Sequence, residues 1–204
     1  MEYKKRREEQ SRQTEQRILR SALELMRERG YEKVSIRDIC AHAEVTTGAF
    51  YHHFPSKEAL VARGFGALDH YVEQVVTAQQ ENTSPVERLR IILGAYADFM
   101  ERESGSLTAR YYRMRLDNAE TDVRLDPTGY VKKAMVDCFR ATEEIGVFSV
   151  DRSPEWLARF CYAHFRGLVI DWMLSGYAYS LRDRMLDEFQ TLIDLFQKRT
   201  PEKE

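Results

Sequence analysis

Residues 35–57 constrain the fold of this chain more than any other segment, because they predict two short helices joined by a tight turn. Ser35 is a suitable N-cap for the first helix, and Asp38, three residues later, occupies the acidic position of a capping box. Thr46 is a suitable N-cap for the second helix, which is expected to end before Pro55 because proline disfavours a helical conformation in the residue that precedes it. The segment is therefore expected to form a helix-turn-helix.

The rest of the chain also predicts helices almost throughout. Apolar residues recur at intervals of three and four, and no segment alternates apolar and polar residues for the length of a strand. Hydroxyl side chains suited to N-cap positions mark four further helix starts: Ser56, Ser84, Ser153 and Ser180. We therefore expect an all-α fold of about nine helices, with a three-helix N-terminal domain over residues 1–56 and a larger helical bundle over residues 57–204.

The same pattern sets the expected helix boundaries. The first helix is expected from about Arg12 to Arg29. The helix that follows Ser56 is expected to continue to the polar stretch near Gln79. Asp126 and Pro127 are expected to open one of the later helices.

Composition and charge limit the classes of function. With 43% hydrophobic and 31% charged residues the chain is typical of a globular protein, and no apolar run approaches the ~18 residues of a membrane span. Residues 1–63 hold 13 Lys and Arg against 10 Asp and Glu, whereas the rest of the chain holds 18 against 23. A mildly basic end on an acidic body suits a protein that binds a polyanion with one end.

Catalytic, metal and targeting signals are not found in the sequence. There is no nucleophile-elbow motif, phosphate loop or metal-ligand spacing, and the adjacent His52 and His53 would point apart on a helix, so we expect no enzyme activity, metal or cofactor. Cys40, Cys138 and Cys161 lack paired spacing and are expected to be free thiols. The charged start lacks the apolar segment of a signal peptide, so a cytoplasmic location without membrane contact is expected.

A resemblance to a known family rests on the segment from Ile18 to Leu60. The residues that carry it are Ile18, Leu19, Ala22, Gly30, Tyr31, Ser35 to Ile39, Ala43, Val45, Thr46, Gly48 and Tyr51 to Leu60. This segment resembles the DNA-binding domain of the tetracycline-repressor (TetR) family of bacterial transcription regulators. Beyond residue 65 only the number and lengths of the expected helices are similar to the family.

The resemblance implies that the second helix of the motif enters the major groove of double-stranded operator DNA. The residues expected to contact DNA are Ser35, Thr46, Thr47, Gly48, Tyr51, His52 and Lys57. Phe50 and Phe54 are expected instead to anchor the motif to its own core. Thr46 has the simpler alternative of acting only as an N-cap. Residues 1–11 resemble the flexible basic arm that many members place on DNA, although a basic terminus is commonly just solvated.

Glu44 departs from the family pattern, which usually has glycine at this position of the turn. The turn calls for a residue that tolerates a positive φ, so Glu44 is expected either to adopt that conformation at a cost of about 1–2 kcal/mol or to alter the turn. Its carboxylate is also expected near the DNA-facing side, where it would repel phosphate unless a base such as Arg37 pairs with it. Replacing Glu44 with glycine is therefore expected to stabilise the domain.

The bundle over residues 57–204 is expected to form a homodimer, because a single helix-turn-helix reads only a few base pairs. The candidate interface residues recur at contact spacing on the last two helices: Phe160, His164, Leu168, Leu192, Leu195 and Phe196. For about half of them the alternative is that they fill the monomer core.

The same bundle is expected to sense an apolar or aromatic small-molecule effector. The candidate pocket residues are aromatic or methionine: Tyr96, Phe99, Met100, Tyr111, Met114, Met135, Phe139, Phe165 and Trp172. The alternative for each is an ordinary core position. We thus expect a homodimeric repressor of a palindromic operator that an effector releases; a regulator without an effector, an activator, a nonspecific DNA binder and an enzyme are the alternatives.

Overall fold

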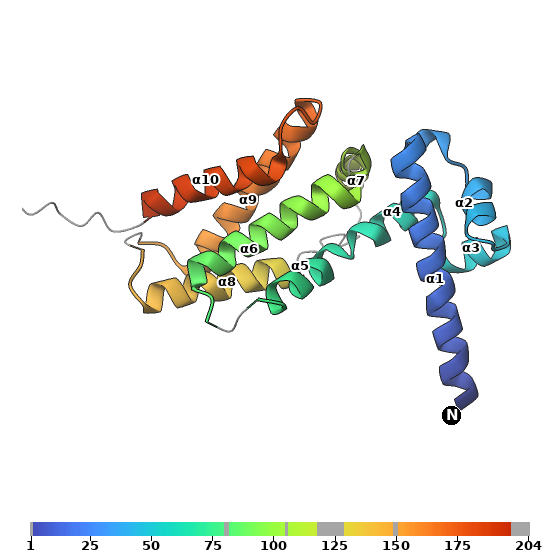
Figure 1. Cartoon of the computed structure of the whole chain (residues 1–204), viewed down its shortest axis with the longest axis horizontal. Coiled ribbons are helices and arrows are strands. Elements are labelled where there is room, and N and C mark those ends of the chain that lie inside the picture. Colours follow the sequence, from blue (N-terminus) through green and yellow to red (C-terminus); the bar gives the residue numbers. More distant parts are fainter. Residues whose placement is uncertain (1, 80–81, 105, 118–128, 149–150, 197–204) are drawn as a thin grey trace, which may run out of the picture. The chain divides into compact units, whose positions relative to one another are not determined.

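The described part of the chain is almost entirely helical (Figure 1). The computed structural model describes residues 2–79, 82–104, 106–117, 129–148 and 151–196. Within these ranges there are ten α-helices, a 3-10 turn (η1, Tyr31–Lys33), a π-helical segment (η2, Phe99–Ser104) and no β-strand, so the predicted all-α class is confirmed. None of the described helices is both long and apolar enough to span a membrane. Asp126 and Pro127 lie outside the described residues.

The helices have the following bounds. They are α1 (Glu2–Arg29), α2 (Ile36–His42), α3 (Thr47–His53), α4 (Lys57–Phe65), α5 (Leu68–Thr77), α6 (Pro85–Asp98), α7 (Ser106–Asp117), α8 (Gly129–Glu144), α9 (Pro154–Leu174) and α10 (Leu181–Phe196).

The predicted N-caps are confirmed by their hydrogen bonds. Each hydroxyl oxygen accepts from the backbone N–H three residues later, at 3.1 to 3.3 Å: Ser35, Thr46, Ser56, Ser84, Ser153 and Ser180. Such caps satisfy one of the backbone donors that a helix start leaves unpaired, and each contributes about 1 kcal/mol. At the other end of α1, Gly30 adopts φ +85°, a conformation that side chains with a Cβ rarely reach. The hydroxyl residues that the sequence marks as N-caps therefore lie at the observed helix starts.

Two expected boundaries were wrong. First, α1 begins at Glu2 and not near Arg12, so the segment expected to be a flexible arm is helical, supported by pairs such as Gln13 Nε2 with Glu9 Oε1 at 3.2 Å. Second, the helix after Ser56 is divided into α4 and α5, because the chain makes a tighter turn in which Ala67 N donates to Gly64 O at 3.1 Å. The absence of a Cβ at Gly64 also lets Leu23 of α1 come close to α4.

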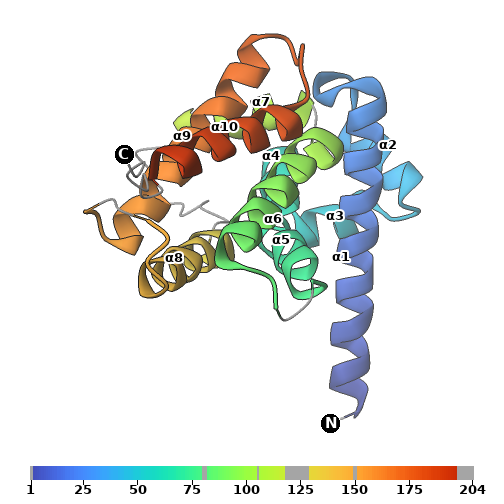
Figure 2. The same cartoon turned by 60° about the vertical axis from the view of Figure 1, so that its left-hand side comes forward.

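Unit 1, the first of two compact units, comprises Met1–Ala67 and Ser104–Leu125. In it α2 and α4 pack against α1, α3 packs against α2, and α7 packs against α4, α1 and η1. Figures 1 and 2 show the N-terminal half of α1 projecting beyond α2 and α3. The structural division therefore falls after residue 67 and not after residue 56, and it places α7 with the helix-turn-helix.

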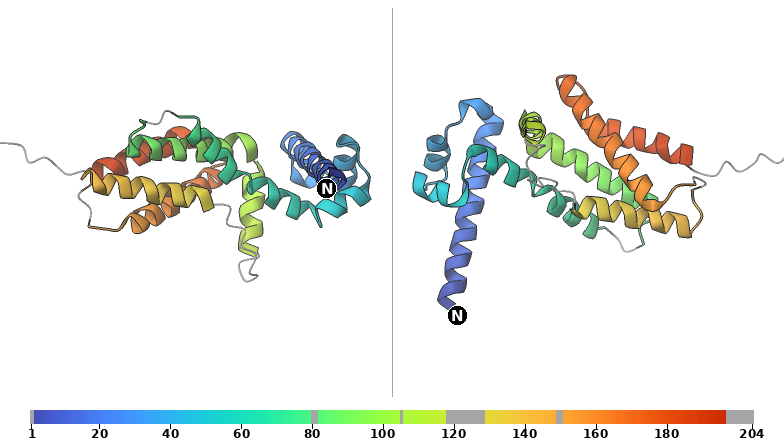
Figure 3. Two further views of the ribbon diagram at one scale, coloured as in Figure 1. Left: turned by 90° about the horizontal axis from the view of Figure 1, so that it is seen from below. Right: turned by 180° about the vertical axis from the view of Figure 1, so that it is seen from behind.

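Unit 2 comprises Leu68–Glu103 and Asp126–Glu204. Its central helix is α6, which packs against α5, α8 and α10, while α9 packs against α8 and α10 (Figure 3). The aliphatic and aromatic side chains of these helices form its core, with Leu89, Ile92 and Phe189 fully buried. Each unit thus has a hydrophobic core of its own.

Candidate nucleic-acid interface

Apolar residues of α2 and α3 face the core of unit 1 and hold the helix-turn-helix in place. Ile39 and Cys40 of α2 are buried, as are Phe50 and Phe54 at the two ends of the last turn of α3. The two phenylalanine rings lie 5.8 Å apart between centroids. Their predicted role as anchors is confirmed, and it fixes which face of α3 points outward.

The turn between the two helices is a Schellman motif centred on Glu44. Glu44 N donates to Ala41 O at 3.3 Å, and Val45 N donates to Cys40 O at 2.9 Å. This pattern requires the left-handed region at the C′ position, and Glu44 has φ +51°. The expectation that Glu44 accepts a strained conformation is therefore confirmed. Among the described contacts no ion pair joins the exposed Glu44 carboxylate to Arg37.

The outward side of α3 carries the small and aromatic polar residues predicted to contact DNA. Thr46, Thr47, Gly48 and His52 are exposed, and Tyr51 is 56% exposed although its ring is large and apolar. The Thr46 hydroxyl oxygen accepts from Ala49 N at 3.1 Å, which leaves its proton available for donation. The structure therefore brings these five residues together on one solvent-facing side of the motif.

Ser35 forms the capping box expected for it, and the hydrogen bonds of that box bear on the phosphate contact that was also predicted. Its hydroxyl donates to Asp38 Oδ2 at 2.5 Å, and its backbone N–H donates to the same carboxylate oxygen at 2.8 Å. These hydrogen bonds lower the pKa of the Asp38 carboxyl. Both donors of Ser35 are therefore engaged in the capping box, and neither is free for a phosphate.

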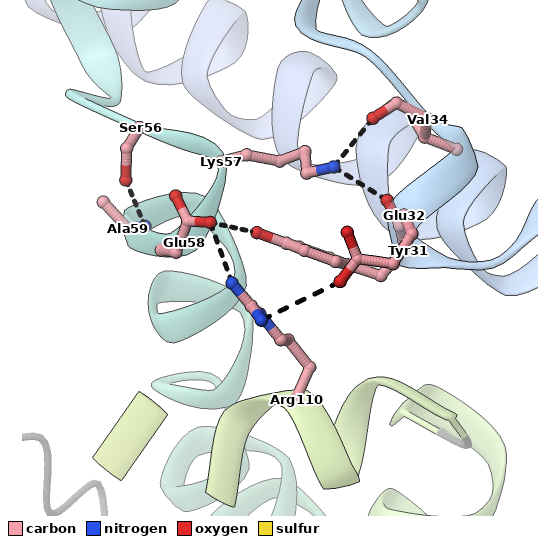
Figure 4. Close-up of polar contacts among 8 residues, drawn as sticks. All are labelled: Tyr31, Glu32, Val34, Ser56, Lys57, Glu58, Ala59 and Arg110. Atoms are coloured by element: carbon pink, nitrogen blue, oxygen red, sulfur yellow. Dashed lines mark hydrogen bonds and ion pairs between the residues drawn. The ribbon is translucent and has the colours of Figure 1, made fainter. Parts of the chain in front are cut away.

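Lys57 is likewise committed inside unit 1. Its ammonium donates to Tyr31 O at 2.8 Å and to Val34 O at 2.9 Å, and its Nζ lies 3.9 Å from the centroid of the Tyr31 ring (Figure 4). Two carbonyl oxygens and an aromatic face take up the charge of this half-buried side chain. The structure thus gives Lys57 a structural role, fastening the start of α4 to the segment that follows α1, and the phosphate contact stays a prediction.

A second cation covers the same tyrosine and ties α7 into this network. Arg110 lies with its guanidinium carbon 4.6 Å from the Tyr31 ring centroid and donates to Glu58 Oε1 at 3.1 Å (Figure 4). The Tyr31 hydroxyl donates to the same Glu58 oxygen at 2.5 Å, and Glu32 lies 3.8 Å from the guanidinium. We name Tyr31, Glu58 and Arg110 the Tyr31 cluster. It joins three segments that lie 27 and 52 residues apart in the sequence.

The electrostatics of the Tyr31 cluster agree with its geometry. The hydrogen bond from Tyr31 lowers the pKa of the Glu58 carboxyl to about 2, and Arg110 adds to that effect. Burial, followed by the Glu58 carboxylate, raises the pKa of Tyr31. Glu58 is therefore charged and Tyr31 neutral at neutral pH, as their hydrogen bond requires. The sequence does not reveal this cluster, because its members are distant from one another in the chain.

The nine predicted effector residues are all buried, but they do not lie in one place. Tyr111 and Met114 belong to unit 1, where Tyr111 stacks on Phe65 with ring centroids 4.0 Å apart, and the other seven belong to unit 2. In unit 2, Trp172 donates through Nε1 to Tyr179 O at 2.9 Å. The pocket role of these nine residues therefore stays a prediction.

A cavity of about 510 Å³ lies elsewhere in unit 2, lined by residues that the sequence reasoning did not select. It lies between α5, the first turn of α6 and α8, and it includes Arg88, Tyr130 and Lys133. Its lining combines charged, polar and apolar side chains, so a pattern of aromatic and methionine residues in the sequence does not identify it.

The predicted dimer residues divide into an exposed and a buried group. Phe160, His164 and Leu195 are exposed, Leu192 and Phe196 are half-buried, and Leu168 is buried in the monomer. The alternative of a core position therefore applies to Leu168. Two further apolar residues of α9 that the sequence analysis did not single out are exposed, namely Ile170 and Leu174, the latter by 82%.

The comparisons with known proteins agree with this arrangement. Residues 18–63 match the model of the bacterial regulatory proteins of the tetR family. The chain is 27% identical over 184 residues to the HTH-type transcriptional repressor DhaR of Mycobacterium sp. (strain GP1), covering 87% of this chain and 89% of that protein.

Two solved structures share the fold. Thermus thermophilus FadR, a TetR-family transcriptional repressor in complex with lauroyl-CoA, has a TM-score of 0.63 and 22% identity, with 93% of this chain and 99% of that chain covered. The ketosteroid transcriptional regulator KstR2 of Mycobacterium tuberculosis has a TM-score of 0.56 and 22% identity, with 91% and 95% covered. At these identities the structures establish the fold, and the family model identifies the DNA-binding segment. Residues 18–63 thus match the tetR family of bacterial regulatory proteins, and over most of its length the chain is similar in sequence to a transcriptional repressor and in fold to a TetR-family repressor.

Proposed function

We propose that this chain is a homodimeric transcriptional repressor that binds a palindromic operator and is released from it by a small-molecule effector. The observation that carries the DNA-binding role is the outward side of α3. Tyr51 is 56% exposed on a helix whose Phe50 is fully buried, so the helix is anchored rigidly while an aromatic hydroxyl side chain faces solvent. Thr46 and Thr47 at the N-terminus of α3 supply donors for phosphates or base edges.

The dimer places two such helices on one face of the DNA. Two recognition helices must be separated by about 34–36 Å to enter successive major grooves. The exposed apolar residues of α9 and α10 support an isologous seam, in which the same patch of both subunits meets, and Phe160 and Leu195 are its central members. Leucine side chains exposed as fully as Leu174 and Leu195 are poorly placed in a monomer and well placed in such a seam.

The effector is proposed to act by shifting a population between two conformations, of which one fits the operator. A ligand can do this only through its different affinity for the two conformations. The chain connects the two units at three points, after residues 67, 103 and 125. A rearrangement in unit 2 is therefore proposed to act on the start of α7, which the Tyr31 cluster fastens to the segment before α2. The complex of a similar fold with lauroyl-CoA and the ketosteroid regulator among its neighbours support an apolar or aromatic effector.

The proposed regulatory role also bears on where the protein works and on whether it has an enzymatic activity. A protein that acts on operator DNA is proposed to work in the bacterial cytoplasm. We propose no enzymatic activity, because regulation by binding needs none and the curated relatives are transcription regulators.

Selection of bound sequences from a random pool of double-stranded DNA tests the proposal directly. The expected result is a palindrome whose half-site centres are about 10 base pairs or a multiple apart, bound by a dimer. Tyr51→Ala is expected to weaken binding to the selected site by about 1–3 kcal/mol. Tyr51→Phe distinguishes the contribution of the hydroxyl to that binding from the contribution of the ring. Glu28→Ala, on the exposed side of α1, is the matched control. Selection of no common sequence, or full affinity in Tyr51→Ala, would contradict the assignment of α3 as the reading element.

A further inference from the structure

The cavity in unit 2 has the size and position of a ligand site. Its volume of about 510 Å³ lies within the ~300–1,000 Å³ of small-molecule sites. It is formed by three helices that pack together, α5, α6 and α8 (Figure 1). α5 and α8 are also joined at its side, since Asp69 Oδ1 accepts from Val131 N at 3.1 Å. We call this cavity the α5–α8 groove.

The charged side chains that line the α5–α8 groove differ in whether they form ion pairs. Two acids line it, of which Asp137 pairs with Arg140 at 3.3 Å and Glu73 is exposed, 4.0 Å from His70 Nδ1. Its two cations are Arg88, which is half-buried, and Lys133. Neither cation forms a hydrogen bond or ion pair within the part of the chain that the structure describes. A half-buried guanidinium without a partner favours the binding of an anion.

The remaining polar groups of the groove are neutral donors. Burial raises the pKa of Tyr130, and burial raises the pKa of the Cys138 thiol to about 11, so both groups keep their protons at neutral pH. They add no negative charge that would oppose an anion. Between them lie apolar side chains, among them the buried Val76 and the half-buried Ala134. The groove therefore contains two cations without a hydrogen-bond or ion-pair partner among the described residues, together with apolar side chains.

We infer that the α5–α8 groove is the effector site and that its ligand is a small amphiphilic carboxylate. The carboxylate lies against the Arg88 guanidinium, whose planar fork matches two carboxylate oxygens, with Lys133 beside it. The apolar body of the ligand lies along Val76 and Ala134. This inference rests on the proposed function, since it names the ligand class of the proposed effector.

The position of the groove explains how such a ligand would influence DNA binding. α5 follows α4 of unit 1 after two intervening residues, so a ligand that spreads α5 from α6 and α8 acts on the first helix of unit 2. The Asp69 hydrogen bond to the start of α8 is the contact that such a movement would strain.

Calorimetric titration of the full chain with matched pairs of compounds tests the inference. The probes are octanoate and octanamide, phenylacetate and phenylacetamide, and inorganic phosphate. Each carboxylate is expected to bind about tenfold or more tightly than its amide, because it gains a charge-assisted hydrogen bond to Arg88. Phosphate, which has the charge but no apolar body, is expected to bind weakly.

Substitutions in the groove test whether the compounds bind there. Arg88→Ala is expected to remove the preference for carboxylate over amide, and Ala134→Phe is expected to weaken both compounds by filling the groove. Arg90→Ala on the same helix is the matched control, since Arg90 contacts Glu87 and Gln190 and does not line the groove. Circular dichroism confirms the fold of each variant. Equal affinity for carboxylate and amide, unchanged preference in Arg88→Ala, or no carboxylate binding at millimolar concentration would overturn the inference.

Operator affinity, measured in parallel, separates this inference from the proposed function. Octanoate or phenylacetate is expected to lower operator affinity of the unmodified chain and to have no such effect on Arg88→Ala. If carboxylates bind in the groove without changing operator affinity, the groove is not the effector site, while the DNA-binding role stands. If neither protein binds a selected DNA sequence, the proposed function fails by a result independent of the titration.

Discussion

Replacing Glu44 with glycine is expected to stabilise unit 1 through the backbone alone. Glu44 holds φ +51° at the C′ position of the Schellman motif that ends α2, a conformation that costs a residue with a Cβ about 1–2 kcal/mol. Glycine removes that strain but gains freedom in the unfolded chain, which offsets about 0.4–1 kcal/mol. The net gain is therefore expected to be about 0.5–1 kcal/mol in the free energy of unfolding.

The assay must report on unit 1, and the chain offers a convenient separation of signals. Its two tryptophans, Trp156 and Trp172, both lie in unit 2. Urea unfolding of the full chain is therefore followed by far-UV circular dichroism for both units and by tryptophan fluorescence for unit 2. Glu44→Gly is expected to move the unit 1 transition to higher urea and to leave the fluorescence transition unchanged.

The control for charge is Glu44→Ala, which removes the same carboxylate but keeps the Cβ and hence the strain. It is expected to give no gain in stability. Both variants are expected to bind operator DNA more tightly than the unmodified chain, because each removes a negative charge beside α3. Equal stabilisation by alanine and glycine would show that charge and not backbone strain was relieved, and a loss of stability in Glu44→Gly would refute the reasoning altogether.

Three further predictions concern the contacts of each unit. The Glu58 carboxyl, whose folded pKa of about 2 lies below its ordinary value of 4.5, contributes stability above pH ~4.5 that is lost as the pH falls towards 2. Glu58→Gln should flatten this pH dependence and cost at most ~1 kcal/mol at neutral pH, because the side chain is 44% exposed. Acid titration followed by circular dichroism would contradict this prediction if the variant kept the same slope. Lys57→Met is expected to lower the free energy of unfolding by about 1–2 kcal/mol yet leave the salt dependence of operator binding unchanged; a salt slope reduced by about 1 would instead identify a phosphate contact. Leu195→Glu on α10 is expected to give a folded monomer in size-exclusion chromatography with light scattering, whereas Leu116→Glu, equally exposed on α7, should stay dimeric; a dimeric Leu195→Glu would remove α10 from the seam.

Local hydrogen bonding explains why so much of the fold was predictable from the sequence. An N-cap such as Ser84 bonds to a backbone donor three residues away, so its signal lies within one short window. The anchoring of α3 by Phe50 and Phe54 follows from their spacing of four, which places both on one face. Errors arose where competing local signals were close in strength, as at the start of α1 and at Gly66, between α4 and α5.

The roles of single polar residues were less predictable, because their partners are distant in the chain. Lys57 looked like a phosphate contact from its place at a helix start, but it bonds to carbonyls 23 and 26 residues earlier. Arg110 joins Glu58 across 52 residues, and no window of sequence contains both. The α5–α8 groove likewise depends on how three helices pack, and its mixed lining carries no compositional signal.

The sequence alone determined the helical class, the caps, the helix-turn-helix and the strained turn at Glu44, since each follows from contacts between near neighbours in the chain. Only the tertiary structure decided which donors of the DNA-facing motif are free, that α7 packs in unit 1, and where unit 2 is hollow. The physical reason is that backbone hydrogen bonds and side-chain periodicity are local, whereas a polar side chain takes whichever partner packing brings within reach. For this reason the residues of α3 predicted to contact DNA are exposed, whereas Ser35 and Lys57 are held by hydrogen bonds within unit 1.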